Sequence, residues 1–353
     1  MSSFAGGADG VIRGFSLDPA TGELEQLYQS DPIPHPFFFN VTPDHGFLYT
    51  IHAESFGGPQ DEQIAAYRFE KDAGTLRLLN RQTTRGSASC FVEIDAEAGA
   101  VLVANYATGS VVSYQIKDDG SLSPPVSFVQ HAGSSVNEAR QSGPHAHCFV
   151  IGPNNRFAYA ADLGLDQILC YALDASTGTV TPNVQPFVRT PPGSGPRHLT
   201  FHPGGRTMYV INELLNSVTR FDFEEDSGIL IERETISTLP DDFAGESYCA
   251  DVKITPDGKF LYGTNRGHDS IAMYRIAEKG ALRLIGFEPS LGEGPQNLAI
   301  TADGRLLLCA NMPGNRVTVF RIDPQSGDLT PLGTPLEVTS PSCLRILEEP
   351  PSP

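Results

Sequence analysis

Short apolar runs separated by turn residues recur along the whole chain. One example is DVKITPDGKFLYGTN at 251–265, in which two runs rich in β-branched and aromatic residues surround a turn. Similar pairs occupy 37–52, 90–105, 147–162, 198–212 and 297–311. Strand-forming runs around turn residues such as Pro256-Asp257-Gly258 predict hairpins. No long stretch shows helical periodicity, so the pattern predicts an all-β protein.

A second repeat predicts how many structural units the chain contains. It is a turn in which an acidic stretch leads to a glycine and, two residues later, a leucine or valine. Its seven copies contain Gly22, Gly74, Gly120, Gly178, Gly228, Gly280 and Gly327. A four-stranded unit of about fifty residues is typical of a propeller blade. We therefore predict a seven-bladed β-propeller of four-stranded antiparallel blades, with residues 1–353 as a single domain.

The two ends of the chain predict how the ring closes. The chain opens with SFAGG and two strand-like runs, and it ends with SPSCLRILEEP, which is typical of an innermost strand without its followers. We expect this C-terminal strand to complete the first blade. Such closure removes exposed sheet edges.

Composition limits the partners and the compartment. The chain has 24 Lys and Arg against 42 Asp and Glu, a net charge of −18, which disfavours nucleic acid and anionic membranes. The N-terminus lacks the basic and apolar regions of a signal peptide, and no apolar run suits a membrane span, so we predict a cytoplasmic protein. Six cysteines without a CxxC pair predict buried free thiols. The sequence leaves the oligomeric state open.

Aligning the repeats places a candidate site. In each blade the start of the innermost strand and the end of its antiparallel neighbour lie on the same face of the ring. The aligned starts are Phe37, Cys90, His147, Arg197, Ala250, Gln296 and Ser342. The aligned ends are Ala53, Tyr106, Leu163, Glu213, Arg266 and Met312. These positions differ from blade to blade, which indicates a site at one mouth of the central channel.

Four of these residues carry the candidate chemistry. They are His147, Arg197, Glu213 and Arg266. Taken singly, each residue also has a purely structural interpretation. His147 could be a hydrogen-bonded structural histidine, Arg197 and Glu213 could form a simple ion pair, and Arg266 could be a solvated charge at the rim. Their convergence in an acidic protein favours an anion-handling site.

Four further residues are candidate substrate contacts: His145, His198, Gln296 and Tyr106. Strand alternation places His145 and His198 on the face opposite to their neighbours. The His-x-His of PHAH has no accompanying carboxylate or cysteine cluster, so no metal is predicted. The glycine-rich PPGSGP lacks the lysine of a phosphate loop, and no cofactor is predicted.

The chain resembles the lactonase family of seven-bladed propellers, which contains the cycloisomerase-type 6-phosphogluconolactonase and is related to the fungal 3-carboxy-cis,cis-muconate lactonizing enzyme. The resemblance is densest in NYATGSV, in VQHAGSSVNEARQSGPHAHCF and in GPRHLTFHPGGRTMYVINE. It implies a catalytic histidine at His147, with Arg197, Glu213 and Arg266 as site residues. The sequence departs from the family at Gln296, where many members carry arginine.

The resemblance implies hydrolysis of a small anionic sugar lactone. His147 would serve as general base and acid together with Glu213, and Arg197 and Arg266 would hold the anionic group or the oxyanion. The order of the roles of His147 and Glu213 stays open. Two alternatives remain: a muconate-type lactonizing or other lactone enzyme of the family, and a non-catalytic propeller that binds a metabolite or a protein.

Overall fold

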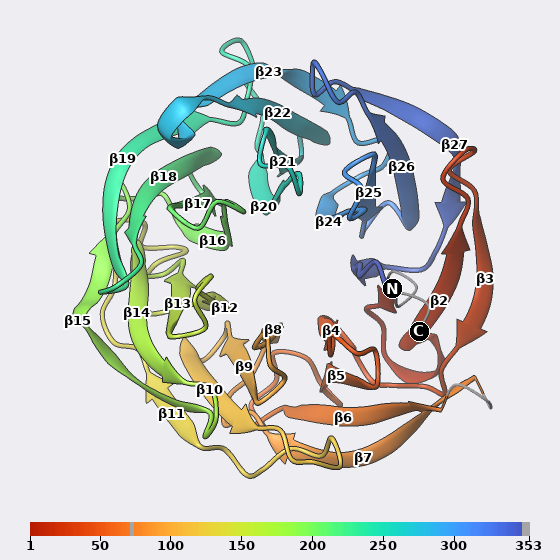
Figure 1. The fold of residues 1–353 in the computed structure, drawn as a ribbon, viewed down its shortest axis with the longest axis vertical. Coiled ribbons are helices and arrows are strands. Elements are labelled where there is room, and N and C mark those ends of the chain that lie inside the picture. Colours follow the sequence, from red (N-terminus) through yellow and green to blue (C-terminus); the bar gives the residue numbers. More distant parts are fainter. Residues whose placement is uncertain (71–73, 348–353) are drawn as a thin grey trace.

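The structure is a computed structural model that describes residues 1–70 and 74–347. In this part of the chain the strands form seven antiparallel sheets of four strands each. Figure 1 shows them as blades around a central axis, with the colour of the chain running once round the ring. The predicted all-β, seven-bladed propeller is therefore confirmed.

Each blade is described from the axis outward. Blade 1 contains β28 (Pro341–Cys343), β1 (Ser2–Ser3), β2 (Val11–Leu17) and β3 (Leu24–Gln29). Blade 2 contains β4 (Phe39–Val41), β5 (Phe47–His52), β6 (Gln63–Glu70) and β7 (Thr75–Thr83). Blade 3 contains β8 (Ser89–Ile94), β9 (Ala100–Asn105), β10 (Ser110–Gln115) and β11 (Ser127–Gln130). Blade 4 contains β12 (Ala146–Ile151), β13 (Phe157–Asp162), β14 (Gln167–Asp174) and β15 (Thr179–Arg189).

The remaining blades follow the same order. Blade 5 contains β16 (Pro196–Phe201), β17 (Thr207–Asn212), β18 (Ser217–Glu224) and β19 (Ile229–Ser237). Blade 6 contains β20 (Tyr248–Ile254), β21 (Phe260–Arg266), β22 (Ser270–Ile276) and β23 (Leu282–Pro289). Blade 7 contains β24 (Pro295–Ile300), β25 (Leu306–Asn311), β26 (Arg316–Ile322) and β27 (Leu329–Glu337). Two short 3₁₀ helices, η1 (Gly7–Asp9) and η2 (Glu278–Gly280), lie in the connections.

The first blade is built from both ends of the chain, as predicted. Strand β28 pairs antiparallel with β1, with Ser2 opposite Cys343 and Ser3 opposite Pro341. The hydroxyls of Ser2 and Ser342 are 3.0 Å apart in this buried seam. The C-terminal strand therefore closes the ring and covers the edge that β1 would otherwise expose.

The core lies between the blades. Strands β9, β13, β17 and β25 are buried along their whole length, because each packs against blades on both sides. The outermost strands are mostly partly buried or exposed, as in β19. All six cysteines are free and buried, which confirms that prediction.

Six of the seven repeated glycines lie against a neighbouring blade; Gly74 does not. All seven have positive φ, as the predicted hairpins require. At Gly120 a Cβ would lie 2.0 Å from the Phe47 ring of the preceding blade. At four junctions a buried tyrosine donates its hydroxyl to the glycine carbonyl of the next blade: Tyr49 to Gly120, Tyr159 to Gly228, Tyr209 to Gly280 and Tyr262 to Gly327.

A β-bulge interrupts the start of several innermost strands. The pairing register shifts between Ser89 and Phe91, between Ala146 and Cys148, between Pro196 and His198, and between Pro295 and Asn297. The residues without a pairing partner are Cys90, His147, Arg197 and Gln296. A bulge re-aims the side chain of its extra residue, so the aligned strand starts differ in geometry from the rest of the strand.

Candidate active site

The four predicted catalytic residues come from three consecutive blades. His147 and Arg197 lie near the starts of β12 and β16, Glu213 follows the last residue of β17, and Arg266 ends β21. Antiparallel pairing places the strand starts and strand ends at one edge, because Pro196 is opposite Asn212 and Tyr248 is opposite Arg266. The repeat alignment therefore brought together residues that are distant in sequence.

Glu213 is the centre of an arginine cluster. Its Oε2 accepts a hydrogen bond from Arg197 Nε at 3.1 Å and forms an ion pair with Arg266 Nη2 at 2.9 Å. Its Oε1 accepts from Arg140 Nη2 at 2.6 Å. Burial acts to raise the pKa of Glu213, but Arg266, Arg197 and Arg140 outweigh it, so the pKa lies below its usual value. Glu213 is therefore an ionised anchor for the arginines at neutral pH.

Three guanidinium groups around one carboxylate leave a surplus of two positive charges. Arg197 is buried, and its Nη1 donates to the carbonyl of Ala250. Burial, followed by the charge of Arg266, lowers the pKa of Arg197 to about 10. It still carries its charge at pH 7. In the described part of the chain no group accepts a hydrogen bond from Arg197 Nη2.

His147 is buried beside this cluster. Its ring centroid lies 5.2 Å from that of Tyr106 and 5.3 Å from that of His198, and Cys90 Sγ is 3.7 Å from Nδ1. Burial lowers the pKa of His147 well below its usual value, and the charge of Arg197 lowers it further. The imidazole is therefore neutral at pH 7. Among residues 1–70 and 74–347, none forms a hydrogen bond with Nε2.

The prediction that His198 faces away from its neighbours is wrong. His198 Nε2 is 3.3 Å from Arg197 Nη1, and its ring contacts that of His147. The bulge at Arg197 breaks the strand alternation, so both residues approach the same network. On its other side, His198 Nδ1 is 2.9 Å from a carboxylate oxygen of Asp251.

The other predicted substrate contacts adjoin the cluster. The rings of Tyr106 and His145 stack with centroids 4.6 Å apart, and His145 Nδ1 is 2.9 Å from the carbonyl of Tyr106. Gln296 is buried, and its side-chain oxygen is 3.5 Å from Arg266 Nη1. Tyr106 and Gln296 thus border the histidine and the arginines, whereas His145 is in contact with Tyr106.

Sequence reasoning missed Arg140. It lies in the loop between β11 and β12, where it donates to Glu213 and, at 3.3 Å, to the hydroxyl of Tyr106. Burial acts to lower its pKa, but the bonds to Glu213 and Tyr106 raise it above the usual value. The loop does not recur from blade to blade, so the repeat alignment could not include it. The only signal was its place in VQHAGSSVNEARQSGPHAHCF, one of the stretches of densest resemblance.

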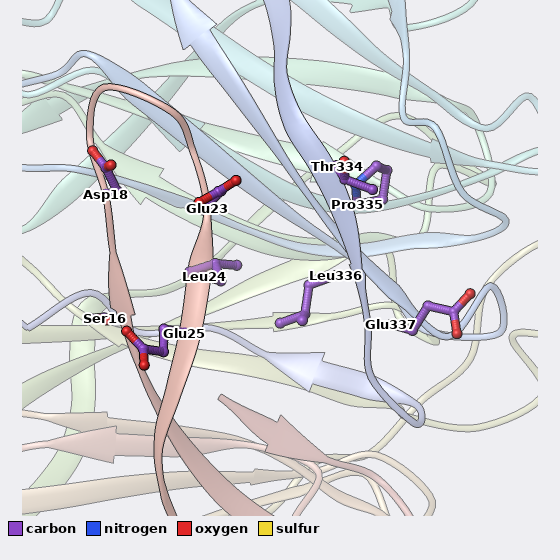
Figure 2. Close-up of a pocket in the computed structure, with 9 residues that line it drawn as sticks. All are labelled: Ser16, Asp18, Glu23, Leu24, Glu25, Thr334, Pro335, Leu336 and Glu337. Atoms are coloured by element: carbon purple, nitrogen blue, oxygen red, sulfur yellow. The ribbon is translucent and has the colours of Figure 1, made fainter.

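A groove of about 620 Å³ lies far from these residues, at the outer rim. Figure 2 shows it between the β2–β3 hairpin and β27, where blades 1 and 7 meet. Its lining includes Asp18, Glu23, Glu25 and Glu337. Four carboxylates repel an anion, so this groove does not suit the predicted ligand.

Two features are absent from residues 1–70 and 74–347. No helix there is long and apolar enough to cross a membrane. No group of three or more His, Cys, Asp or Glu side chains is arranged to hold a metal ion.

Fold and site together define a seven-bladed β-propeller with a neutral histidine beside an arginine-bound glutamate. Residues 1–346 match the family model described as "Lactonase, 7-bladed beta-propeller". The chain belongs to this family, which confirms the predicted class of enzyme, a lactonase.

Named relatives cover nearly the whole chain. The 6-phosphogluconolactonase of Bacillus subtilis strain 168 is 32% identical over 346 residues, which are 98% of this chain and 96% of that protein. The 6-phosphogluconolactonase of Formosa agariphila is 32% identical, with 95% of each chain covered. The solved structure of the periplasmic gluconolactonase PpgL of Pseudomonas aeruginosa has a TM-score of 0.91 and 30% identity, covering 99% of this chain and 98% of that one. Because this relative is periplasmic, the cytoplasmic location stays a prediction.

Proposed function

We propose that the protein hydrolyses a sugar lactone at the site around His147 and Glu213. One observation carries the proposal. The His147 imidazole is neutral, its Nε2 forms no hydrogen bond within the described residues, and it lies beside three arginines and one glutamate that together carry two surplus positive charges. An imidazole that is unprotonated at neutral pH can act as a general base toward water, and fixed guanidinium groups stabilise a developing oxyanion.

In the proposed mechanism His147 Nε2 removes a proton from water as the water oxygen attacks the lactone carbonyl. The carbonyl oxygen becomes an oxyanion, which Arg197 stabilises through Nη2. The ring C–O bond then breaks, and protonated His147 returns its proton to the leaving alkoxide. The product is the open hydroxy acid. Glu213 holds Arg197 and Arg266 in place instead of acting as the base, because its pKa is lowered and its oxygens are occupied by arginines.

The relatives' names suggest the type of substrate. Two of them are called 6-phosphogluconolactonase and one gluconolactonase, so gluconolactone and its 6-phosphate are the first substrates to assay. An anionic group on the substrate would meet the accessible side of the arginine cluster, where Arg266 is part-exposed.

Replacement of the histidine tests the proposal. We expect His147→Asn to lower kcat by ~10²-fold or more without loss of the fold, because no general base remains. The measurement is lactone hydrolysis at pH 6–7, corrected for spontaneous hydrolysis, together with circular dichroism. His45→Asn is the matched control, because His45 lies in a turn with positive φ that asparagine tolerates.

Full turnover by His147→Asn would remove His147 from the mechanism. Absence of lactone hydrolysis by the unmodified protein would contradict the proposed reaction itself. Formation of a lactone from a muconate-type acid would then support the cyclisation alternative, and ligand-induced thermal stabilisation without turnover would support a binding protein.

A further inference from the structure

The three arginines around Glu213 differ in their access to solvent. The side chain of Arg197 is 2% exposed, whereas those of Arg140 and Arg266 are 34% and 26% exposed. Arg197 therefore lies on the buried side of the Glu213 carboxylate, next to His198 and near His147. Arg140 and Arg266 face the accessible side.

Both part-exposed arginines have N–H groups that are not fully used in hydrogen bonds. Arg140 uses only Nη2, which contacts Glu213 and the hydroxyl of Tyr106. In the described part of the chain, Arg140 Nε and Nη1 have no acceptor. Arg266 donates through Nε and Nη2 to two backbone carbonyls, and its Nη1 has one acceptor, the side-chain oxygen of Gln296, at the long distance of 3.5 Å. Two planar guanidinium groups with unused N–H donors suit a polyoxygen anion.

The loop that carries Arg140 is held firmly. Buried Asp166 accepts from Ser135 and Gln141 on this loop, at 2.5 and 2.7 Å. It also accepts from the backbone N–H groups of Gly193 and Gly195, which precede β16 and Arg197. Asp166 thus ties the loop of Arg140 to the segment that positions Arg197. The guanidinium of Arg140 also lies 5.7 Å from the centroid of the Tyr248 ring.

We propose that Arg140 and Arg266 form a subsite for a phosphate monoester on the substrate, and that Arg140 determines the preference for phosphorylated over neutral lactones. This inference rests on the proposed lactone hydrolysis. A phosphate monoester carries a charge of about −1.5 to −2 at pH 7. This charge is opposite in sign and similar in size to the two surplus positive charges of the arginine cluster. The phosphate lies at the accessible side, and the lactone carbonyl lies toward Arg197 and His147.

The test compares Arg140→Gln with the unmodified protein on two substrates. We expect kcat/KM for 6-phosphogluconolactone to fall by about 10- to 100-fold, the range of one lost charge-assisted hydrogen bond. We expect kcat/KM for unphosphorylated gluconolactone to fall by a clearly smaller factor, because this substrate lacks the phosphate and Arg140 then acts only through Glu213. The matched control is Arg77→Gln. Arg77 is an exposed arginine on the outermost strand β7, and it is paired with Glu70.

A binding measurement separates this inference from the proposed reaction. Inorganic phosphate should raise the melting temperature of the unmodified protein and of Arg77→Gln, and should have little effect on Arg140→Gln. If the unmodified protein binds phosphate but hydrolyses no lactone, and Arg140→Gln does not bind phosphate, the subsite is supported and the proposed reaction is rejected. An equal fall in kcat/KM for both lactones would overturn the inference, because Arg140 would then only position Glu213. Stabilisation by malonate but not by phosphate would overturn the assignment to a phosphate group.

Discussion

At the scale of single residues, burial sets the charge of the histidines in the site. It is the main reason why the pKa values of His147 and His198 lie below their usual value. For His198 it lowers the pKa to about 4, although Asp251 acts in the opposite direction. Both rings are therefore neutral in the folded protein at pH 7, and one of them is free to accept a proton.

The pH dependence of stability tests this account. Below about pH 6.5 the unfolded chain binds a proton at residue 198 that the folded chain does not bind until about pH 4. The free energy of unfolding should therefore fall as pH decreases through this window, by roughly 3 kcal/mol for this residue. Urea unfolding between pH 4 and 7.5 measures it.

The variant His198→Gln gives the comparison, because glutamine keeps hydrogen-bonding capacity and does not titrate. Its stability should depend on pH less steeply, by about one proton across the window. The same slope in both proteins would show that His198 is not the titrating group.

The sequence predicted some site residues better than others. His147, Arg197, Glu213 and Arg266 occupy repeated positions, so aligning the blades was enough to place them near one another. The orientation of His198 could not be predicted, because a bulge leaves no sign in the alternation of residues. Arg140 could not be placed, because it lies in a loop outside the repeat.

At the scale of elements, the hairpin glycines account for most of what could be predicted. Each has positive φ, which the sequence pattern predicts, and all except Gly74 lie against the preceding blade of the ring. The tyrosine–glycine hydrogen bonds between blades were not predicted, because they join residues 65 to 71 positions apart. Such contacts depend on how two blades pack.

One of these contacts provides a stability prediction. Tyr209→Phe removes the hydroxyl that donates to the buried carbonyl of Gly280 at 2.6 Å. We expect the free energy of unfolding to fall by about 1–2 kcal/mol, because the carbonyl loses its partner. Urea unfolding of the variant measures the change.

The matched control is Tyr248→Phe. Tyr248 is 38% exposed, and in the described residues its hydroxyl forms no hydrogen bond. This variant should stay within about 0.5 kcal/mol of the unmodified protein. Equal stability of both variants would show that the contact between blades contributes little.

At the scale of the whole molecule, two features matter: the distribution of charge and the closure of the propeller ring. The net charge is −18, yet the site gathers three arginines on one glutamate. A local cationic site in an acidic protein can select small anions while the surface repels nucleic acid. The chain ends predicted closure of the ring, and the convergence of a histidine, two arginines and a glutamate in an acidic protein predicted an anion-handling site.

A disulfide across the closing seam tests how far closure limits stability. Ser2 and Ser342 are buried with their hydroxyl oxygens 3.0 Å apart, so Ser2→Cys combined with Ser342→Cys places two thiols in contact. The bond should raise the free energy of unfolding by about 2–4 kcal/mol, because it links the two ends of the unfolded chain.

Urea unfolding with and without a reducing agent measures this effect. The single variant Ser342→Cys serves as the control, since its midpoint should not depend on the reducing agent. Native Cys343 lies opposite Ser2 in the seam, so the single variant Ser2→Cys is measured as well, to separate a bond with Cys343 from the intended pair. Identical midpoints for the oxidised and reduced double variant would show that opening of the seam does not limit unfolding.

The bulges at the strand starts have a consequence for protein engineering. An inserted residue without a cross-strand partner can be exchanged while the register of its neighbours is kept. Cys90 and Gln296 occupy such positions on either side of His147 and Arg197 in the order of the blades. A combinatorial library confined to these two positions would diversify the chemistry beside the imidazole of His147 and beside Arg266 on an unchanged scaffold.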